Sequence, residues 1–62
     1  MSKNLLYQKA REFVEKAQFY KGQGDIERAK NSLSSAFANS TPAEQEQLRG
    51  MQKRISHLED SL

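Results

Sequence analysis

The residues that could carry out chemistry in this 62-residue chain are few and widely separated. Ser32, Ser34 and Ser35 form a cluster of hydroxyl groups, but a serine nucleophile needs an adjacent base that accepts its proton. The one histidine, His57, lies in a different predicted helix, so the serines and a base are not in register. Paired carboxylates are also lacking. The sequence therefore predicts no catalytic residue, and we expect a protein that is not an enzyme.

The sequence also lacks the motifs of a cofactor-binding or metal-binding site. The stretch Gly22-Gln23-Gly24 has neither the length nor the lysine of a phosphate-binding loop. His57 has no second histidine with which to share a metal ion, and the chain has no cysteine, so it can form neither a thiolate site nor a disulfide. We expect no cofactor, no bound metal and no small-molecule substrate.

The charge balance argues only weakly for nucleic acid. Ten lysines and arginines stand against eight acidic residues, which gives a net charge of +2 without a basic run. A groove that follows phosphates needs several cations on one face, with aromatic side chains between them. Glu12 and Glu15 lie among the cations of the predicted first helix, so the sequence disfavours a nucleic-acid binder. Those cations are Lys9, Arg11, Lys16 and Lys21. A nucleic-acid binder would have to use Lys9, Lys16, Lys21, Arg28 and Lys30.

Apolar residues never run for more than two or three positions, which predicts no membrane span. Residues 1–3 are too short to form a charged leader, so we expect no signal peptide and a cytoplasmic protein.

The elements that must position these side chains are helices. Two periodic segments meet at Tyr20–Asp25, where Gly22 and Gly24 can supply left-handed backbone values and Asp25 can cap the next helix. This pattern predicts a helical hairpin, with a first helix near residues 4–21 that Ser2 or Asn4 caps. The second helix is expected near residues 25–39.

A third helix is predicted near residues 42–60. Thr41 and Glu44 have the spacing of a capping box, and Pro42 suits the first helical position. The fold class is therefore all-α, a hairpin plus a third helix in one small domain that spans residues 1–62. The residues predicted for the shared core are Phe13, Ala17, Tyr20, Ala29, Leu33 and Phe37.

Two apolar features remain for a partner. Leu5 and Phe19 point away from the apolar stripe of the first helix, and for Phe19 burial under the third helix is favoured over exposure to a partner. The third helix carries a narrow apolar seam, whose neighbour is either the hairpin or a second copy of the chain. The seam consists of Leu48, Met51, Ile55, Leu58 and Leu62.

These features predict a non-enzymatic module that binds a helical protein partner or itself. The alternative is a structural homo-oligomer held by the seam of the third helix. The predicted partner-binding residues are Phe19, Leu48, Met51, Ile55 and Leu58.

Residues 10–43 resemble one tetratricopeptide repeat. The resemblance rests on Phe13, Ala17, Tyr20, Gly24-Asp25, Ala29, Leu33, Ala36 and Pro42, and it implies a helical hairpin. The hairpin with its third helix is also similar to the three-helix microtubule-interacting-and-trafficking domain, which implies binding of helical peptides. The segment 29–41 resembles short uncharacterised proteins of Bacillus-type bacteria, a resemblance that implies a bacterial protein and supplies no activity.

Overall fold

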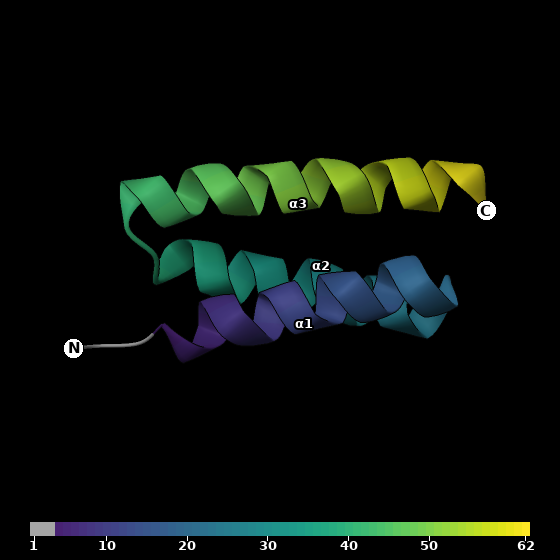
Figure 1. Cartoon of the computed structure of the whole chain (residues 1–62), viewed down its shortest axis with the longest axis horizontal. Helices are drawn as coiled ribbons and strands as arrows, with labels where there is room; N and C mark the ends of the chain where they lie inside the picture. The colour runs from purple at the N-terminus through teal and green to yellow at the C-terminus, as the bar shows by residue number, and fades with distance from the viewer. Residues whose placement is uncertain (1–3) are drawn as a thin grey trace.

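The computed structural model describes residues 4–62, which form three α-helices joined by short turns. They are α1 (Leu5–Tyr20), α2 (Gln23–Ala38) and α3 (Pro42–Ser61). Figure 1 shows α1 and α2 as an antiparallel hairpin, with α3 lying along it. The molecule extends 38 Å along its longest axis. The predicted three-helix bundle is confirmed, and each predicted helix end lies within two residues of the observed one.

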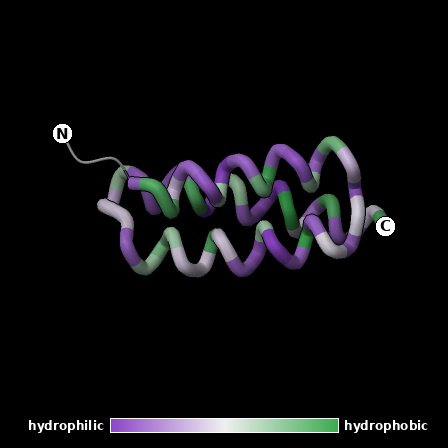
Figure 2. Tube along the Cα trace, turned by 90° about the horizontal axis from the view of Figure 1, so that it is seen from below, coloured by the Kyte–Doolittle hydropathy of each residue, from purple (hydrophilic) through white to green (hydrophobic). Residues whose placement is uncertain are grey.

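The core takes a narrow stripe from each helix. Its hydrophobic residues recur every three or four positions, which is the spacing of one helix face, and Figure 2 shows such residues alternating with hydrophilic ones along the chain. The buried residues are Ala10, Val14, Ala17, Ile26, Ala29, Leu33, Ala36, Leu48, Met51 and Ile55. Four of the ten are alanines, so the helices approach closely around little apolar volume.

The predicted core is only partly correct. Ala17, Ala29 and Leu33 are buried, while Phe13 and Phe37 are half-buried and pack against the edge of the core. Tyr20 was placed wrongly, since it is 66% exposed. It is the last residue of α1, and only the turn lies beyond it, so the end of the hairpin has no helix to cover its ring.

The turn between α1 and α2 differs from the prediction in the residues that end α1 and cap α2. Lys21, not a glycine, adopts the left-handed conformation (φ 58°, ψ 31°), and its amide donates to the carbonyl of Ala17 at 2.8 Å. Gly22 is extended and is the N-cap of α2, which has no side-chain capping bond. Asp25 therefore lies inside the first turn of α2 and does not cap it. The left-handed residue must follow the helix directly, and Gly22 comes one position too late.

Lys21→Gly is expected to raise the free energy of unfolding by about 0.5–1 kcal/mol. A left-handed conformation costs a residue with a Cβ roughly 1–2 kcal/mol, and the greater freedom of glycine in the unfolded chain offsets part of that gain. Urea unfolding followed by circular dichroism measures the difference. Lys21→Ala retains the Cβ and is the control, and an equal gain in both variants would show that the left-handed backbone is not the cause.

The start of α3 follows the prediction. The Thr41 hydroxyl accepts from the Glu44 amide at 3.3 Å, and Glu44 Oε1 accepts from the Thr41 amide at 3.0 Å. Pro42 occupies the first helical position, where no amide donor is needed. The predicted capping box is therefore confirmed.

Asn4 ties the start of α1 to this box. Its Oδ1 accepts from the Tyr7 amide at 3.0 Å, which makes it the N-cap of α1. Its Nδ2 donates to Ser40 Oγ at 2.9 Å and to Glu44 Oε1 at 3.1 Å. The alternative cap, Ser2, lies outside the described residues. One side chain thus joins the ends of all three helices, and we call Asn4, Ser40, Thr41 and Glu44 the polar cluster.

The polar cluster makes stability depend on pH through Glu44. The hydrogen bond from the Thr41 amide, followed by that from Asn4, holds the pKa of Glu44 below its ordinary value of 4.5. A lowered folded-state pKa stabilises the fold above the unfolded value, and this contribution is lost as the pH falls through the folded value. The melting temperature of the wild type should therefore exceed that of Glu44→Gln most at neutral pH, and the gap should narrow below about pH 4.5. A gap that stayed constant from pH 7 to pH 2 would contradict this assignment.

Gly50 lies in the middle of α3 on the exposed side, where a Cβ would meet no atom within 4 Å. Its backbone is helical, so alanine fits without strain. Gly50→Ala should therefore raise the free energy of unfolding by about 1 kcal/mol. Thermal unfolding tests this expectation, and a destabilised variant would show that some group approaches this backbone closely.

Candidate partner-binding surface

The apolar seam of α3 lies inside the molecule. Leu48, Met51 and Ile55 are buried in the same core as α1 and α2, so they offer no surface to a partner. This corrects their assignment as partner-binding residues and identifies the neighbour that the sequence left open, which is the hairpin of the same chain. The seam has the narrow width that one hairpin groove can cover.

Only the far end of the seam keeps accessible apolar surface. Leu58 is half-buried and packs against the core, and Leu62 is 55% exposed at the end of the chain. A shallow groove lies between α1 and α3 beside Leu58, and we call it the α1–α3 groove. Its lining residues are Gln18, Arg54, His57, Leu58 and Ser61. Contact between these two helices is the least extensive of the three pairs, which leaves the groove open.

Phe19 is 78% exposed, so the expectation that α3 covers it was wrong. The side of α1 that meets α3 is marked by Tyr7, whose hydroxyl donates to Gln47 of α3. Phe19 comes twelve residues later, and at about 100° per residue it is turned about 120° from Tyr7. It immediately follows Gln18, which lines the α1–α3 groove.

Phe19 has an aromatic neighbour. Its ring meets that of Tyr20 edge to face, with centroids 4.9 Å apart and an interplanar angle of 89°. Both rings line a shallow hollow with Glu12, Glu15 and Lys16. α1 holds four of the five exposed large hydrophobic residues, so it carries most of the accessible apolar surface in the described chain. Those four are Leu5, Leu6, Phe19 and Tyr20.

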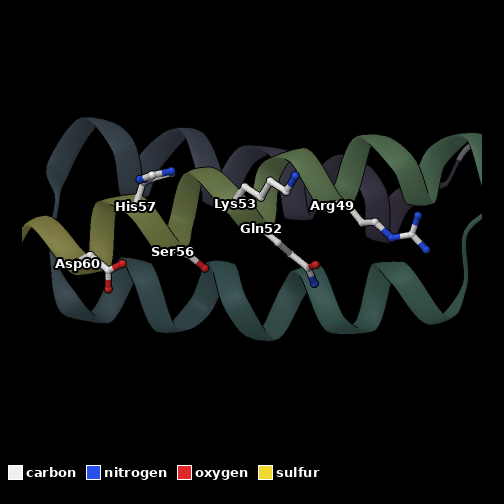
Figure 3. Close-up of a pocket in the computed structure, with 6 residues that line it drawn as sticks. All are labelled: Arg49, Gln52, Lys53, Ser56, His57 and Asp60. Carbon is white, nitrogen blue, oxygen red and sulfur yellow. The ribbon is translucent and has the colours of Figure 1, made fainter.

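The outward side of α3 is polar. Figure 3 shows the six residues that line its hollow, all from this one helix, so no second element closes the site. Ser56, His57 and Asp60 have the side-chain types of a hydrolase, but no hydrogen bond joins them within residues 4–62. In Figure 3 the imidazole of His57 points to the side of the helix opposite Ser56 and Asp60. This arrangement is a solvated helix face.

Two of the basic residues are engaged by carboxylates. Lys30 Nζ lies 3.2 Å from Glu59 of α3 and 3.9 Å from Glu27, and the hydrogen bond with Glu59 raises the pKa of Lys30 above 10.5. Arg49 pairs with Glu46 at 3.0 Å. All three pairs are solvent-exposed and contribute little to stability. Lys30 is therefore removed from the set of cations available to an anionic ligand.

Residues 4–62 contain neither a cluster of metal-ligand side chains nor a helix that could cross a membrane. Across residues 4–62, no three histidine, cysteine or acidic side chains gather as metal ligands. None of α1, α2 and α3 has the length and apolar character needed to cross a bilayer.

Sequence reasoning missed two residues of the exposed surface, Tyr20 and Gln18. The signal for Tyr20 was available, because the last residue before a glycine turn has no partner helix beyond it. Gln18 gave no signal, since a glutamine on a helix is ordinary and only packing shows that it borders a groove.

Comparison with known proteins identifies a family and a relative that this chain resembles. A family described as "Protein of unknown function (DUF3813)" matches residues 1–58. A protein of Bacillus subtilis (strain 168), described as "Uncharacterized protein YizC", is 42% identical over 64 residues, which cover 92% of this chain and 98% of that protein. No solved structure matches. The resemblance to short uncharacterised proteins of Bacillus-type bacteria is confirmed, whereas these comparisons lend no support to the tetratricopeptide resemblance.

Proposed function

The chain belongs to the DUF3813 family of proteins of unknown function, and we propose that it is a non-enzymatic protein–protein interaction module that binds a helix of another protein. The observation that carries the proposal is the exposure of Phe19, the residue after Gln18, which lines the open α1–α3 groove. The folded chain leaves this aromatic side chain in water although α3 packs nearby on α1.

Phe19 has enough uncovered area to anchor a partner. Burial of the exposed part of a phenylalanine contributes about 3 kcal/mol at roughly 25 cal/mol per Å². That is about a hundredfold in a dissociation constant before association costs are subtracted. Tyr20 supports the ring through its edge-to-face contact, so the anchor is oriented before a partner arrives.

The α1–α3 groove is the proposed site for the partner helix. Helical partners commonly place an apolar face in a groove between two helices, with anchors spaced by three or four residues. Leu58 provides an apolar floor, and Gln18 and Arg54 provide polar edges that can hydrogen-bond to a partner. Phe19 is turned about 100° from Gln18 around α1, so a partner must cover the groove and extend over α1 to contact both Leu58 and Phe19.

The alternative of a homo-oligomer held by the α3 seam loses its basis. Leu48, Met51 and Ile55 are already covered by the hairpin, so a second copy would find only Leu58 and Leu62 at one end. A stable interface commonly buries about 800 Å² on each partner, far more than these two side chains expose.

The test compares two substitutions of exposed apolar residues on α1. Phe19→Ser removes the proposed anchor, and Leu5→Ser removes a residue of similar exposure at the opposite end of the helix. Tagged wild type captures proteins from a lysate of a bacterium that carries a family member. The captured protein is then purified and titrated by calorimetry against all three forms.

Phe19→Ser should weaken binding of the purified partner about 10- to 100-fold, because the anchor supplies that much free energy. Leu5→Ser should bind as the wild type does, and all three proteins should melt at the same temperature. Equal affinity of wild type and Phe19→Ser, or equal losses in both variants, would refute the proposed surface.

A further inference from the structure

We propose that the side of the hairpin formed by α1 and α2, away from α3, binds single-stranded nucleic acid. This basic face lies beside the surface assigned to a protein partner and shares Tyr20 with it. It is made of Lys9, Phe13, Lys16 and Tyr20 of α1 and Arg28 of α2, with polar residues of α2 along its edge.

The α1 part of the basic face alternates cations and aromatic rings. Lys9, Phe13, Lys16 and Tyr20 follow one another at steps of four, three and four, which places them in one stripe of the helix. Lys16 Nζ lies over the ring of Phe13, 6.0 Å from its centroid. Tyr20 is largely exposed, so a base can stack on its ring.

The α2 part adds a cation and neutral hydrogen-bonding groups. Lys9 shares a shallow hollow with Asn31, Ser32 and Ser35, which establishes that this stripe of α1 borders α2. Arg28 precedes Ser32 by four residues and therefore lies on the same side of α2. From residue 28 to residue 43 the chain has no acidic side chain that would repel an anion.

The acidic residues that weakened this hypothesis at the sequence level border the stripe on the side away from α2, where Glu12 lies about 60° from Lys9 and about 40° from Lys16. At about 100° per residue, Glu12 is turned about 100° from Phe13 and Glu15 about 160°. Both line the hollow that contains Phe19, which Lys16 and Tyr20 of the stripe also line, and neither lines the hollow of Lys9 against α2. Across residues 4–62, no carboxylate comes within 4.0 Å of the amino groups of Lys9 and Lys16 or the guanidinium of Arg28.

Single-stranded nucleic acid fits this chemistry better than an acidic protein helix does. Cations meet phosphates, aromatic rings meet bases, and serine and asparagine side chains commonly bind the sugar-phosphate backbone. A partner helix would need a continuous apolar stripe, whereas here each ring is separated from the next by a lysine. The stripe from Lys9 to Tyr20 is about 16 Å long at 1.5 Å per residue, which accommodates about four or five stacked nucleotides.

Fluorescence anisotropy with labelled twelve-nucleotide probes of thymidine (DNA) and uridine (RNA) tests the proposal at 50 and 200 mM salt. Three phosphate contacts predict that affinity falls about 20-fold over this range, from a logarithmic slope of about −0.7 per contact. Comparing the two probes shows whether the 2′-hydroxyl group matters. Tyr20→Ser should weaken binding at least about fivefold through loss of stacking.

Two triple variants of equal net charge separate the basic face from general charge attraction. Lys9→Gln with Lys16→Gln and Arg28→Gln should lose at least about tenfold in affinity at 50 mM salt. Arg11→Gln with Arg49→Gln and Lys53→Gln removes three exposed cations elsewhere and should bind nearly as the wild type does.

Three outcomes would overturn the proposal. The first is no anisotropy change with either probe at 50 mM salt. The second is an equal loss in both triple variants, which would show attraction by net charge alone. The third is binding of a twelve-residue polyglutamate peptide as tightly as the oligonucleotides and without dependence on Tyr20, which would assign the face to an acidic protein. The triple variant of Lys9, Lys16 and Arg28 leaves both Phe19 and Tyr20 unchanged, so its result is independent of the proposed protein partner.

Discussion

Ile55→Lys should unfold the chain at 25 °C. Ile55 is 2% exposed and packs with residues of all three helices in the core. The lysine would either bury an unpaired ammonium group or force α3 away from the hairpin, and burial of an unpaired charge costs several kcal/mol. A domain of this size with so small a core has only a few kcal/mol of stability. Circular dichroism should therefore show loss of the helical signal.

Ser56→Lys is the matched control for this change. It introduces the same side chain one position later, on the exposed side of α3, and should remain folded. A folded Ile55→Lys protein with a lower mass than the wild type would contradict the account, because it would mean that Ile55 contacts a second copy of the chain.

Asn4→Ala should lower the free energy of unfolding by about 2 kcal/mol, which is large for one polar side chain. Loss of an N-cap alone costs about 1 kcal/mol. The same change removes the hydrogen bonds to Ser40 and Glu44 that join α1 to the start of α3, and these two partly exposed bonds together contribute about 1 kcal/mol more. The melting temperature should fall by about 10 °C in a domain of this length.

Asn4→Asp separates the two roles of this side chain. The carboxylate can still accept from the Tyr7 amide, but it cannot donate to Ser40 or Glu44. It also places a negative charge beside Glu44. The cap is therefore retained while the link between helices is lost, and the melting temperature should fall between those of the wild type and Asn4→Ala. An Asn4→Ala protein as stable as the wild type would show that the polar cluster is incidental.

Local patterns in the sequence were sufficient to predict the helices. Apolar spacing of three and four residues defined three amphipathic segments, and the Thr41–Glu44 capping box located the start of α3. These signals act over one or two helical turns, so they can be recognised without knowing what packs where.

The rotation of each helix in the bundle could not be predicted from the same signals. The apolar residues of α1 cover a wide arc, and only packing against α2 and α3 selects Ala10, Val14 and Ala17 as the buried stripe. This selection exposes Tyr20 and leaves Phe13 at the edge. It also places Glu12 and Glu15 at the edge of the basic face, away from α2, which the linear sequence does not show.

The sequence could not show whether the α3 seam packs against the hairpin of the same chain or against a second copy. A narrow apolar stripe fits equally well in a groove of the same molecule or against another copy. The structure places it against the hairpin, which leaves Phe19 and the α1–α3 groove accessible, and these are the features on which the proposed partner surface rests.

The most direct test of the central claim, that one chain alone buries the α3 seam, is sedimentation equilibrium over a dilution series, with circular dichroism on the same samples. The claim predicts a monomer of 7.1 kDa that keeps its full helical signal at the lowest concentration. A dimer that loses helical signal as it dissociates would contradict it, because the seam would then be buried between chains.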